Sequence, residues 1–142
     1  MNPLGQKLKE VADRYGLRDV YVFGSRAAEI AARFSDAPEP VAPTASDLDL
    51  AVQPMPGHTL GARDRVRVAG AFEDLFSVPR VDLVVLSEAS SLLAVELVRG
   101  ELLYTADPRA QAEQELYVLR RAADLAPFQS ERVRRILSSG AR

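Results

Sequence analysis

The sequence has 142 residues, 47% of them hydrophobic and 27% charged, which suits one folded domain and excludes a disordered chain. Eighteen basic and twenty acidic side chains leave a formal net charge of -2, which gives no overall electrostatic reason to bind nucleic acid or an anionic membrane. Cysteine is absent, no apolar run approaches the ~18 residues of a membrane helix, and the N-terminus has no apolar signal core, so we expect a cytoplasmic protein without disulfides.

The first half of the chain is predicted to alternate helices and strands. Apolar residues at helical spacing predict a helix over 4–15. The β-branched and aromatic run 19–23 predicts a strand, and a helix is expected over 26–34. Residues 35–46 contain three prolines and no periodicity, which indicates a surface loop. Alternation with period two then predicts a second strand over 47–52.

The next elements continue the alternation. Apolar spacing predicts a helix over 60–76. Residues 81–86 are apolar apart from Asp82, a pattern that suits a strand covered on both faces. A short helix is predicted over 90–99, with Gly100 as its cap.

The C-terminal part of the chain completes the predicted fold. Residues 102–105 favour an edge strand, and 108–137 favour a helical tail that proline breaks near 126–127. Strands that alternate with helices indicate a sheet with helices packed on it. We therefore expect a single domain over 1–142 of α/β (α+β) class, with a mostly antiparallel or mixed sheet of about four strands and a C-terminal helical tail over 108–142.

Two aspartates on one predicted strand are the first candidates for a site. Asp47 and Asp49 stand at positions i and i+2, so they point to the same face, while Leu48 and Leu50 point to the other. Like charges ~4 Å apart repel by roughly 4 kcal/mol near a protein surface. A divalent cation turns that repulsion into attraction, and Mg²⁺ prefers carboxylate and phosphate oxygens. Taken alone, the triplet is also typical of a solvated strand edge.

Asp82 is a third candidate, because it stands alone inside an apolar strand. Charged groups are seldom buried without a partner, so it either serves a function, caps a helix or pairs with an arginine. If its strand neighbours the one that carries Asp47 and Asp49, three carboxylates converge. Such a cluster can hold two cations ~3.5–4 Å apart, which activate an attacking hydroxyl and stabilise the leaving oxygens.

Gly24 and Ser25 follow the first predicted strand and precede a helix. A glycine there allows the backbone to approach a phosphate closely, and the helix N-terminus favours an anion. The Ser25 hydroxyl adds a donor, and Arg26 is a candidate third contact. A Gly-Ser pair at a strand end is also common in ordinary turns, so the hypothesis depends on the aspartates.

Other charged residues have simpler interpretations. His58 is the only histidine and lies in a Pro-Gly loop, so we expect a solvated residue rather than a ligand or base. The C-terminal part is locally basic, which indicates either a solvated face or a contact for an acidic partner or nucleic acid. The arginines concerned are Arg120, Arg121, Arg132, Arg134 and Arg135.

The three motifs together resemble the minimal nucleotidyltransferases of the DNA polymerase β-like superfamily. That family carries Gly-Ser at a strand-to-helix turn, Asp-x-Asp on the next strand and a third aspartate in an apolar strand. The matching segments are Gly24-Ser25-Arg26-Ala27, Ser46-Asp47-Leu48-Asp49-Leu50 and Val81-Asp82-Leu83-Val84. Residues 102–104 and, more loosely, Tyr117 with 124–127 are similar to the end of the MntA-type antitoxin subset, which pairs with HEPN-domain ribonuclease toxins.

The resemblance implies a magnesium-dependent protein adenylyltransferase, which transfers AMP from ATP to a hydroxyl. In the antitoxin subset the acceptor is a tyrosine of the partner HEPN toxin, and the modification silences that toxin. By position, Asp47 and Asp49 would hold two Mg²⁺ ions. Asp82 would bind the catalytic ion and activate the acceptor hydroxyl, while Gly24 and Ser25 would hold the triphosphate.

Two departures from the family pattern stand close to these motifs. Many members continue Gly-Ser-x-Ala with Arg-Gly, where this chain has Ala28-Glu29, so a basic phosphate contact is missing and an acidic group is gained. The stretch between Ser25 and Asp47 is also longer than usual, and the excess is the proline-rich loop 35–46. Loop closure becomes only slowly more costly with length, so the loop need not disturb the site.

Two alternative functions stay open. One is a stand-alone transferase that acts on a small molecule or RNA, which the short chain and the lack of a strongly basic surface oppose. The other is a non-catalytic antitoxin of the same fold that neutralises by occlusion, which Ala28-Glu29 favours and the intact carboxylates oppose. The expected partners are a cognate HEPN toxin and ATP, within a possible homo- or hetero-oligomer and without a membrane.

Overall fold

The computed structural model describes residues 2–34 and 47–140, with the segment 126–140 as backbone only. The predicted loop 35–46 lies outside the described residues. In chain order the elements are α1 (Pro3–Tyr15), β1 (Leu17–Phe23), α2 (Ala27–Ala32), β2 (Leu48–Pro54), α3 (Ala62–Phe76), β3 (Val81–Val85), the 3₁₀ turn η1 (Leu86–Glu88), α4 (Ser91–Val98), β4 (Glu101–Thr105) and α5 (Pro108–Gly140). The predicted order of elements is confirmed.

The four strands form one mixed sheet in the order β3-β2-β1-β4. β1 runs antiparallel to both β2 and β4, whereas β2 and β3 run parallel. The prediction of a mixed four-stranded sheet is therefore confirmed, and β4 is an edge strand as expected. β3 is the other edge, so it is not covered as fully as its apolar sequence predicted.

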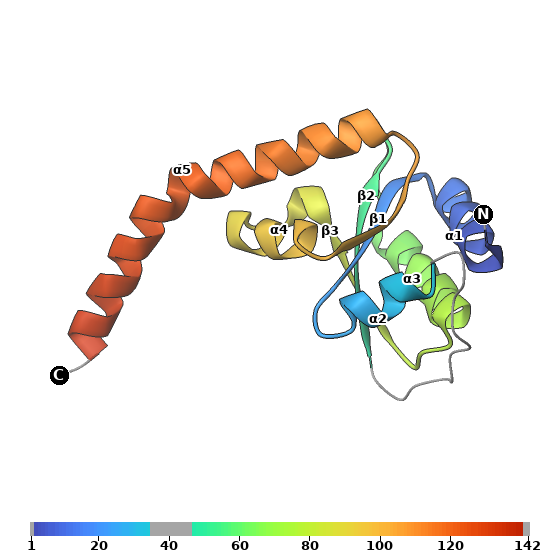
Figure 1. The fold of residues 1–142 in the computed structure, drawn as a ribbon, viewed down its shortest axis with the longest axis horizontal. Coiled ribbons are helices and arrows are strands. Elements are labelled where there is room, and N and C mark those ends of the chain that lie inside the picture. The colour runs from blue at the N-terminus through green and yellow to red at the C-terminus, as the bar shows by residue number, and fades with distance from the viewer. Residues whose placement is uncertain (1, 35–46, 141–142) are drawn as a thin grey trace.

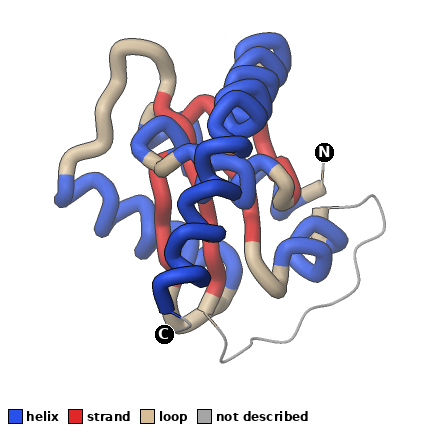
Figure 2. Tube along the Cα trace, turned by 90° about the vertical axis from the view of Figure 1, so that its left-hand side faces the viewer, coloured by secondary structure: helices blue, strands red, loops and turns tan. Residues whose placement is uncertain are grey.

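Helices cover both faces of the sheet (Figures 1 and 2). α1, α2 and α3 pack on one face, where Val22, Leu50 and Phe72 belong to the larger core cluster. α4 and the first half of α5 pack on the other face, where Tyr21 and Ala51 belong to a second cluster. The two clusters alternate along the strands because successive side chains point to opposite faces.

The first strand begins earlier than predicted, at Leu17 rather than Asp19. Arg18 and Asp19 are both buried, and the guanidinium of Arg18 donates to Asp19 Oδ2 from Nε at 2.9 Å and from Nη2 at 2.7 Å. Thr105 on β4 donates to the other carboxylate oxygen of Asp19 at 2.6 Å, and Arg18 also donates to Gln114 on α5. Two adjacent charged residues thus satisfy each other inside the fold, and the predicted strand left out the first of them, Arg18.

α5 corrects the predicted break near 126–127, because the helix is continuous from Pro108 to Gly140. An interior proline removes one backbone hydrogen bond and kinks a helix without having to end it, and α5 changes direction along its course (Figure 1). Despite its 33 residues, α5 is rich in charge. No helix within 2–34 and 47–140 combines the length and apolar character needed to cross a membrane.

Gly100 does not act as the predicted left-handed cap, because Arg99 is the C-cap of α4 and Gly100 has no positive φ. Its role is close approach, since a Cβ atom at this position would lie 2.3 Å from the carbonyl oxygen of Val22. The turn between α4 and β4 therefore passes directly over the backbone of β1.

Replacing Gly100 by alanine should lower the free energy of unfolding by about 1–3 kcal/mol, the usual cost of forcing an extra carbon into a packed site. Urea denaturation followed by circular dichroism measures the effect. Gly70→Ala in the interior of α3 is the matched control, because a Cβ there meets nothing within 4 Å. In this control the free energy of unfolding should rise by about 0.5–1 kcal/mol, because alanine has a higher helix propensity than glycine. Equal midpoints for the two variants would contradict the close-approach role.

Candidate active site

Asp49 and Asp82 lie opposite each other on neighbouring strands. The parallel register of β2 and β3 pairs Asp49 with Asp82 directly. Two residues further along each strand, Ala51 and Val84 belong to the core between the sheet and α4 and α5. Alternation therefore places the two carboxylates on that same face, at the end of the sheet where β2 and β3 begin.

Asp47 completes the group from the residue that precedes β2. It is exposed, whereas Leu48 behind it is fully buried on the opposite face. Burial raises the pKa of Asp49 above the ordinary aspartate value, and the negative charges of Asp82 and Asp47 raise it further. The charges of Asp82 and Asp47 thus both act on Asp49, and the meeting of all three carboxylates at one cation stays a prediction.

Asp82 also has a cationic neighbour. Its Oδ1 lies 3.0 Å from Nη2 of Arg80, and the side chains are 44% and 69% exposed. The pairing with an arginine that the sequence left open is therefore present as well. An exposed pair of this kind contributes little to stability, so it does not bind Asp82 tightly in that position.

The carboxylates fit a divalent cation by their chemistry. The described residues contain no group of three acidic or histidine side chains close enough together to hold an ion. Three like charges without a cation repel one another, and the pKa of Asp49 is raised first by burial and then by this repulsion. Carboxylate oxygens are the ligands that Mg²⁺ prefers, so a cation would relieve the unfavourable charge at this end of the sheet.

The Gly-Ser turn lies directly beside Asp49. Phe23, the last residue of β1, pairs with Asp49 in the antiparallel register. Gly24 follows with φ of 82°, and a Cβ atom on it would lie 2.8 Å from Oδ2 of Asp49. Only glycine combines this backbone conformation with so close an approach. Ser25 next to it is exposed, so its hydroxyl can reach a ligand at the carboxylates.

Arg26 contacts the acidic residue that departs from the family pattern. Its Nε and Nη2 donate to Glu29 at 3.3 and 3.1 Å, and Arg33 Nη2 donates to the same carboxylate at 3.1 Å. The hydrogen bond from Arg26 is the main reason why the pKa of Glu29 lies below its ordinary value. The acidic charge gained at Glu29 is thus balanced by two arginines, and Arg26 would have to leave Glu29 to contact a phosphate.

His58 is exposed, as predicted, and plays no part in this group. Its ring lies over Gly16, where a Cβ atom would come within 2.9 Å of it. The backbone of Met55 donates to the Gly16 carbonyl at 2.8 Å, so this loop lies at the end of β2 opposite to Asp47.

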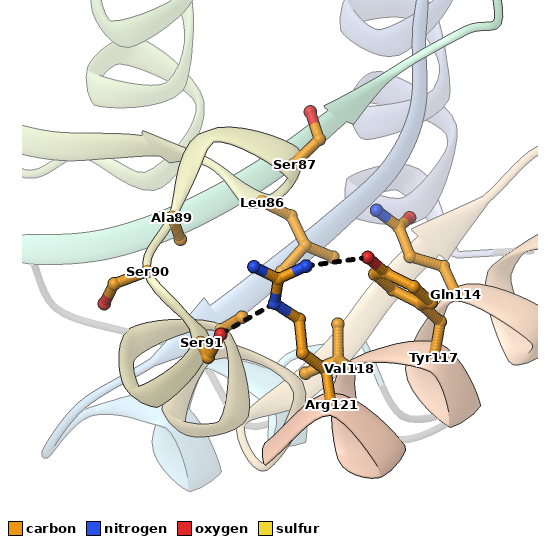
Figure 3. A pocket seen from close by; sticks show the side chains of 10 residues that line it. Leu86, Ser87, Ala89, Ser90, Ser91, Gln114, Tyr117, Val118 and Arg121 are labelled. Atoms are coloured by element: carbon orange, nitrogen blue, oxygen red, sulfur yellow. Dashed lines mark hydrogen bonds between the residues drawn. The ribbon is translucent and has the colours of Figure 1, made fainter. Parts of the chain in front are cut away.

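Sequence reasoning missed a pocket on the same side of the sheet. It measures about 280 Å³ and lies between η1 and α4 on one side and α5 on the other (Figure 3). Its residues come from three separate elements, so no local pattern marks them. The sequence singled out two of its members for other reasons, Arg121 as part of a basic segment and Tyr117 in the family resemblance.

Three solved structures share the fold of this chain at low sequence identity. A chain of an MntA–HpeT toxin–antitoxin mutant is 22% identical with a TM-score of 0.65, and the match covers 100% of both chains. A toxin–antitoxin with AMP-PNP is 23% identical with a TM-score of 0.63, and the match covers 97% of this chain and 98% of that chain. The structure of a tri-AMPylated Shewanella oneidensis HEPN toxin in complex with MNT antitoxin contains a chain that is 22% identical with a TM-score of 0.61. The match covers 98% of this chain and 97% of that chain.

The family comparison covers most of the chain. No match is found among curated proteins. The family model described as polymerase beta, nucleotidyltransferase matches residues 6–109, a range that includes the Gly-Ser turn and all three aspartates. The four-stranded sheet with these carboxylates at one end agrees with that match. The chain is a member of the polymerase β nucleotidyltransferase family.

Proposed function

We propose that this nucleotidyltransferase is magnesium-dependent and transfers AMP from ATP to a protein hydroxyl, namely a tyrosine of a HEPN-domain toxin, and so acts as an antitoxin. The observation that carries the proposal is Asp49, which faces Asp82 across two strands and lies against the Gly24 turn. Carboxylates beside a glycine turn suit a cation and the phosphates that it neutralises.

Each residue has a role in this proposal. Asp47, Asp49 and Asp82 would hold Mg²⁺, which when bound lowers the pKa of the attacking hydroxyl and neutralises charge on the phosphates. The side chain of Asp82 is 44% exposed, so it would orient the acceptor hydroxyl and receive its proton. Gly24 would admit a phosphate to the turn, and Ser25 would donate a hydrogen bond to it.

The structural neighbours support the choice of acceptor. One of them is described with AMP-PNP, an ATP analogue, and another contains a tri-AMPylated HEPN toxin. Because these neighbours are less than 25% identical, their likeness bears on fold, and the substrate and partner are proposed here. Arg26 and Arg33 balance the acidic charge of Glu29, which weakens one of the two reasons for a non-catalytic antitoxin.

Labelled nucleotide tests the proposal. The protein is incubated with ATP labelled on the α-phosphate, Mg²⁺ and the HEPN-domain protein encoded beside it, and label on the partner is followed by gel and mass spectrometry. We expect AMP on a partner tyrosine, and EDTA should reduce the label to background because the carboxylates then lack their cation. Tight binding without label would show an occluding antitoxin. Label on RNA or a small molecule alone would show a stand-alone transferase.

A further inference from the structure

The pocket between α4 and α5 carries a positive charge without an acidic neighbour. Its lining includes the buried apolar residues Leu86, Ala94 and Val118 and several polar residues, and Figure 3 shows the pocket. Among all the lining residues Arg121 is the only charged one, and none is an aspartate or glutamate. In a chain whose formal net charge is -2, such a site favours an anionic group.

The guanidinium of Arg121 is held in place by neutral groups. Its Nε donates to Ser91 Oγ on α4 at 2.9 Å, and its Nη1 donates to the Tyr117 hydroxyl at 3.0 Å (Figure 3). Within the described part of the chain, no carboxylate forms an ion pair with it. Arg18, Arg26, Arg33 and Arg65, in contrast, each have an acidic partner. Arg121 is therefore oriented in advance, and its charge is still available to a ligand.

The surroundings of the pocket are those of a protein interface. Eight large hydrophobic side chains of the described residues are exposed, and five of them lie on α4 and the first half of α5. The five are Leu92, Leu93, Leu116, Tyr117 and Leu119. Exposed apolar residues on two neighbouring helices, together with a tyrosine and an arginine in the pocket between them, are typical of protein–protein interfaces. We call these five residues, with Arg121, the α4–α5 surface.

The α4–α5 surface and the carboxylates share one side of the sheet. Ala51 lies two residues after Asp49 on β2, and it packs in the cluster that contains Leu86 of the pocket lining. The chain from Asp82 also leads through β3 into η1, which forms one wall of the pocket. A protein that covers the α4–α5 surface can therefore reach toward the carboxylates without crossing the sheet.

We propose that the α4–α5 surface docks the acceptor protein, and that an aspartate or glutamate side chain of that protein enters the pocket and pairs with Arg121. This inference rests on the proposed function, because it assigns a place to the protein acceptor named there. A volume of about 280 Å³ admits one such side chain, below the ~300–1,000 Å³ of most small-molecule pockets. The docked acceptor would then be held by contacts separate from the reacting tyrosine.

Charge reversal at Arg121 tests the proposal. Arg121→Glu should raise the dissociation constant of the HEPN-domain protein at least about 30-fold in calorimetry, since loss of a buried interfacial charge pair costs that much or more. Arg120→Glu is the matched control: it makes the same change on the adjacent, exposed α5 residue, which does not line the pocket. The control should change the constant less than about 3-fold.

A second measurement separates docking from chemistry. Binding of AMP-PNP with Mg²⁺ should be equal in Arg121→Glu and in the unchanged protein, because Arg121 does not contact the carboxylates. Labelled transfer to the partner should fall at low partner concentration and recover as that concentration rises. An Asp-to-Lys or Glu-to-Lys variant of the partner that restores binding to Arg121→Glu would identify the acidic residue and support the proposal.

Several results would overturn the docking proposal. One is a partner affinity of Arg121→Glu within 3-fold of that of the unchanged protein, and another is an equal loss of affinity in Arg120→Glu. The others are no binding of the partner by the unchanged protein, and self-association of the unchanged chain that Arg121→Glu alone abolishes. The last result would make a second copy the occupant. Failure of the proposed function looks different: the partner would bind and carry no label, while the effect of Arg121→Glu on binding would persist.

Discussion

Replacing Asp49 by asparagine should reduce nucleotidyl transfer at least about 1,000-fold, which corresponds to about 4 kcal/mol of transition-state stabilisation. Asp49 is central to the group, because it faces Asp82 and its pKa responds to both Asp82 and Asp47. An amide is a poorer cation ligand than a carboxylate and carries no charge, so the proposed site would lose a ligand for Mg²⁺.

The same substitution should not weaken the fold. The pKa of Asp49 is raised in the folded protein, so at neutral pH its ionised form costs more free energy there than in the unfolded chain. Asparagine removes this cost, and the thermal midpoint in EDTA should be unchanged or higher. Mg²⁺ should raise the midpoint of the unchanged protein more than that of the variant.

Transfer assays and melting curves on a matched pair check both parts. Asp74→Asn is the control, because Asp74 is exposed on α3, which covers the opposite face of the sheet. It should retain full transfer activity. Transfer by Asp49→Asn within 10-fold of the unchanged protein would remove Asp49 from the proposed machinery, and a large loss of stability in EDTA would contradict the repulsion.

Gly24→Ala should reduce transfer roughly 100-fold, because a misplacement of about 1 Å at reacting groups has an effect of that size. Its Cβ would lie 2.8 Å from Oδ2 of Asp49, so the carboxylate or the turn has to shift. Because φ of Gly24 is 82°, alanine there should also lower the free energy of unfolding by about 1–2 kcal/mol.

Gly57 provides a control that separates strain from position. Its φ is 79°, close to that of Gly24, but a Cβ on it meets nothing within 4 Å. Gly57→Ala should therefore lose a similar amount of stability in urea denaturation and keep its transfer activity. If both variants lost activity alike, strain alone would explain the result and the close approach to Asp49 would have no special role.

Local patterns predicted the elements and the faces of the strands. Period-two alternation placed Leu48 and Leu50 in the core and Asp49 on the other side, which the burial of the two leucines confirms. The pairing of β2 with β3, and so the meeting of Asp49 and Asp82, lies between distant segments. Composition and spacing do not determine such a pairing, so the sequence analysis could state it only as a condition.

The sequence analysis missed features that depend on contacts between particular side chains. The predicted strand began at Asp19 and left out Leu17 and Arg18, yet Arg18 pairs with Asp19 inside β1. Arg26 and Glu29 stand three residues apart, a spacing at which opposite charges meet on a helix, and that spacing predicts their ion pair. The pocket beside Arg121 combines η1, α4 and α5, so only the assembled fold shows it.

The place of β3 at the border of the sheet affects how an inactive protein should be made. Asp82 is the only charged residue of β3, and charged side chains on a border strand discourage pairing with another molecule. With alanine in place of Asp82, residues 81–86 would be six uncharged residues of high strand propensity, a composition typical of fibril-forming segments. An inactive variant made by replacing Asp82 would thus be prone to aggregate. A variant made by replacing Asp49 on the inner strand β2 keeps the charge of Asp82 on the border strand.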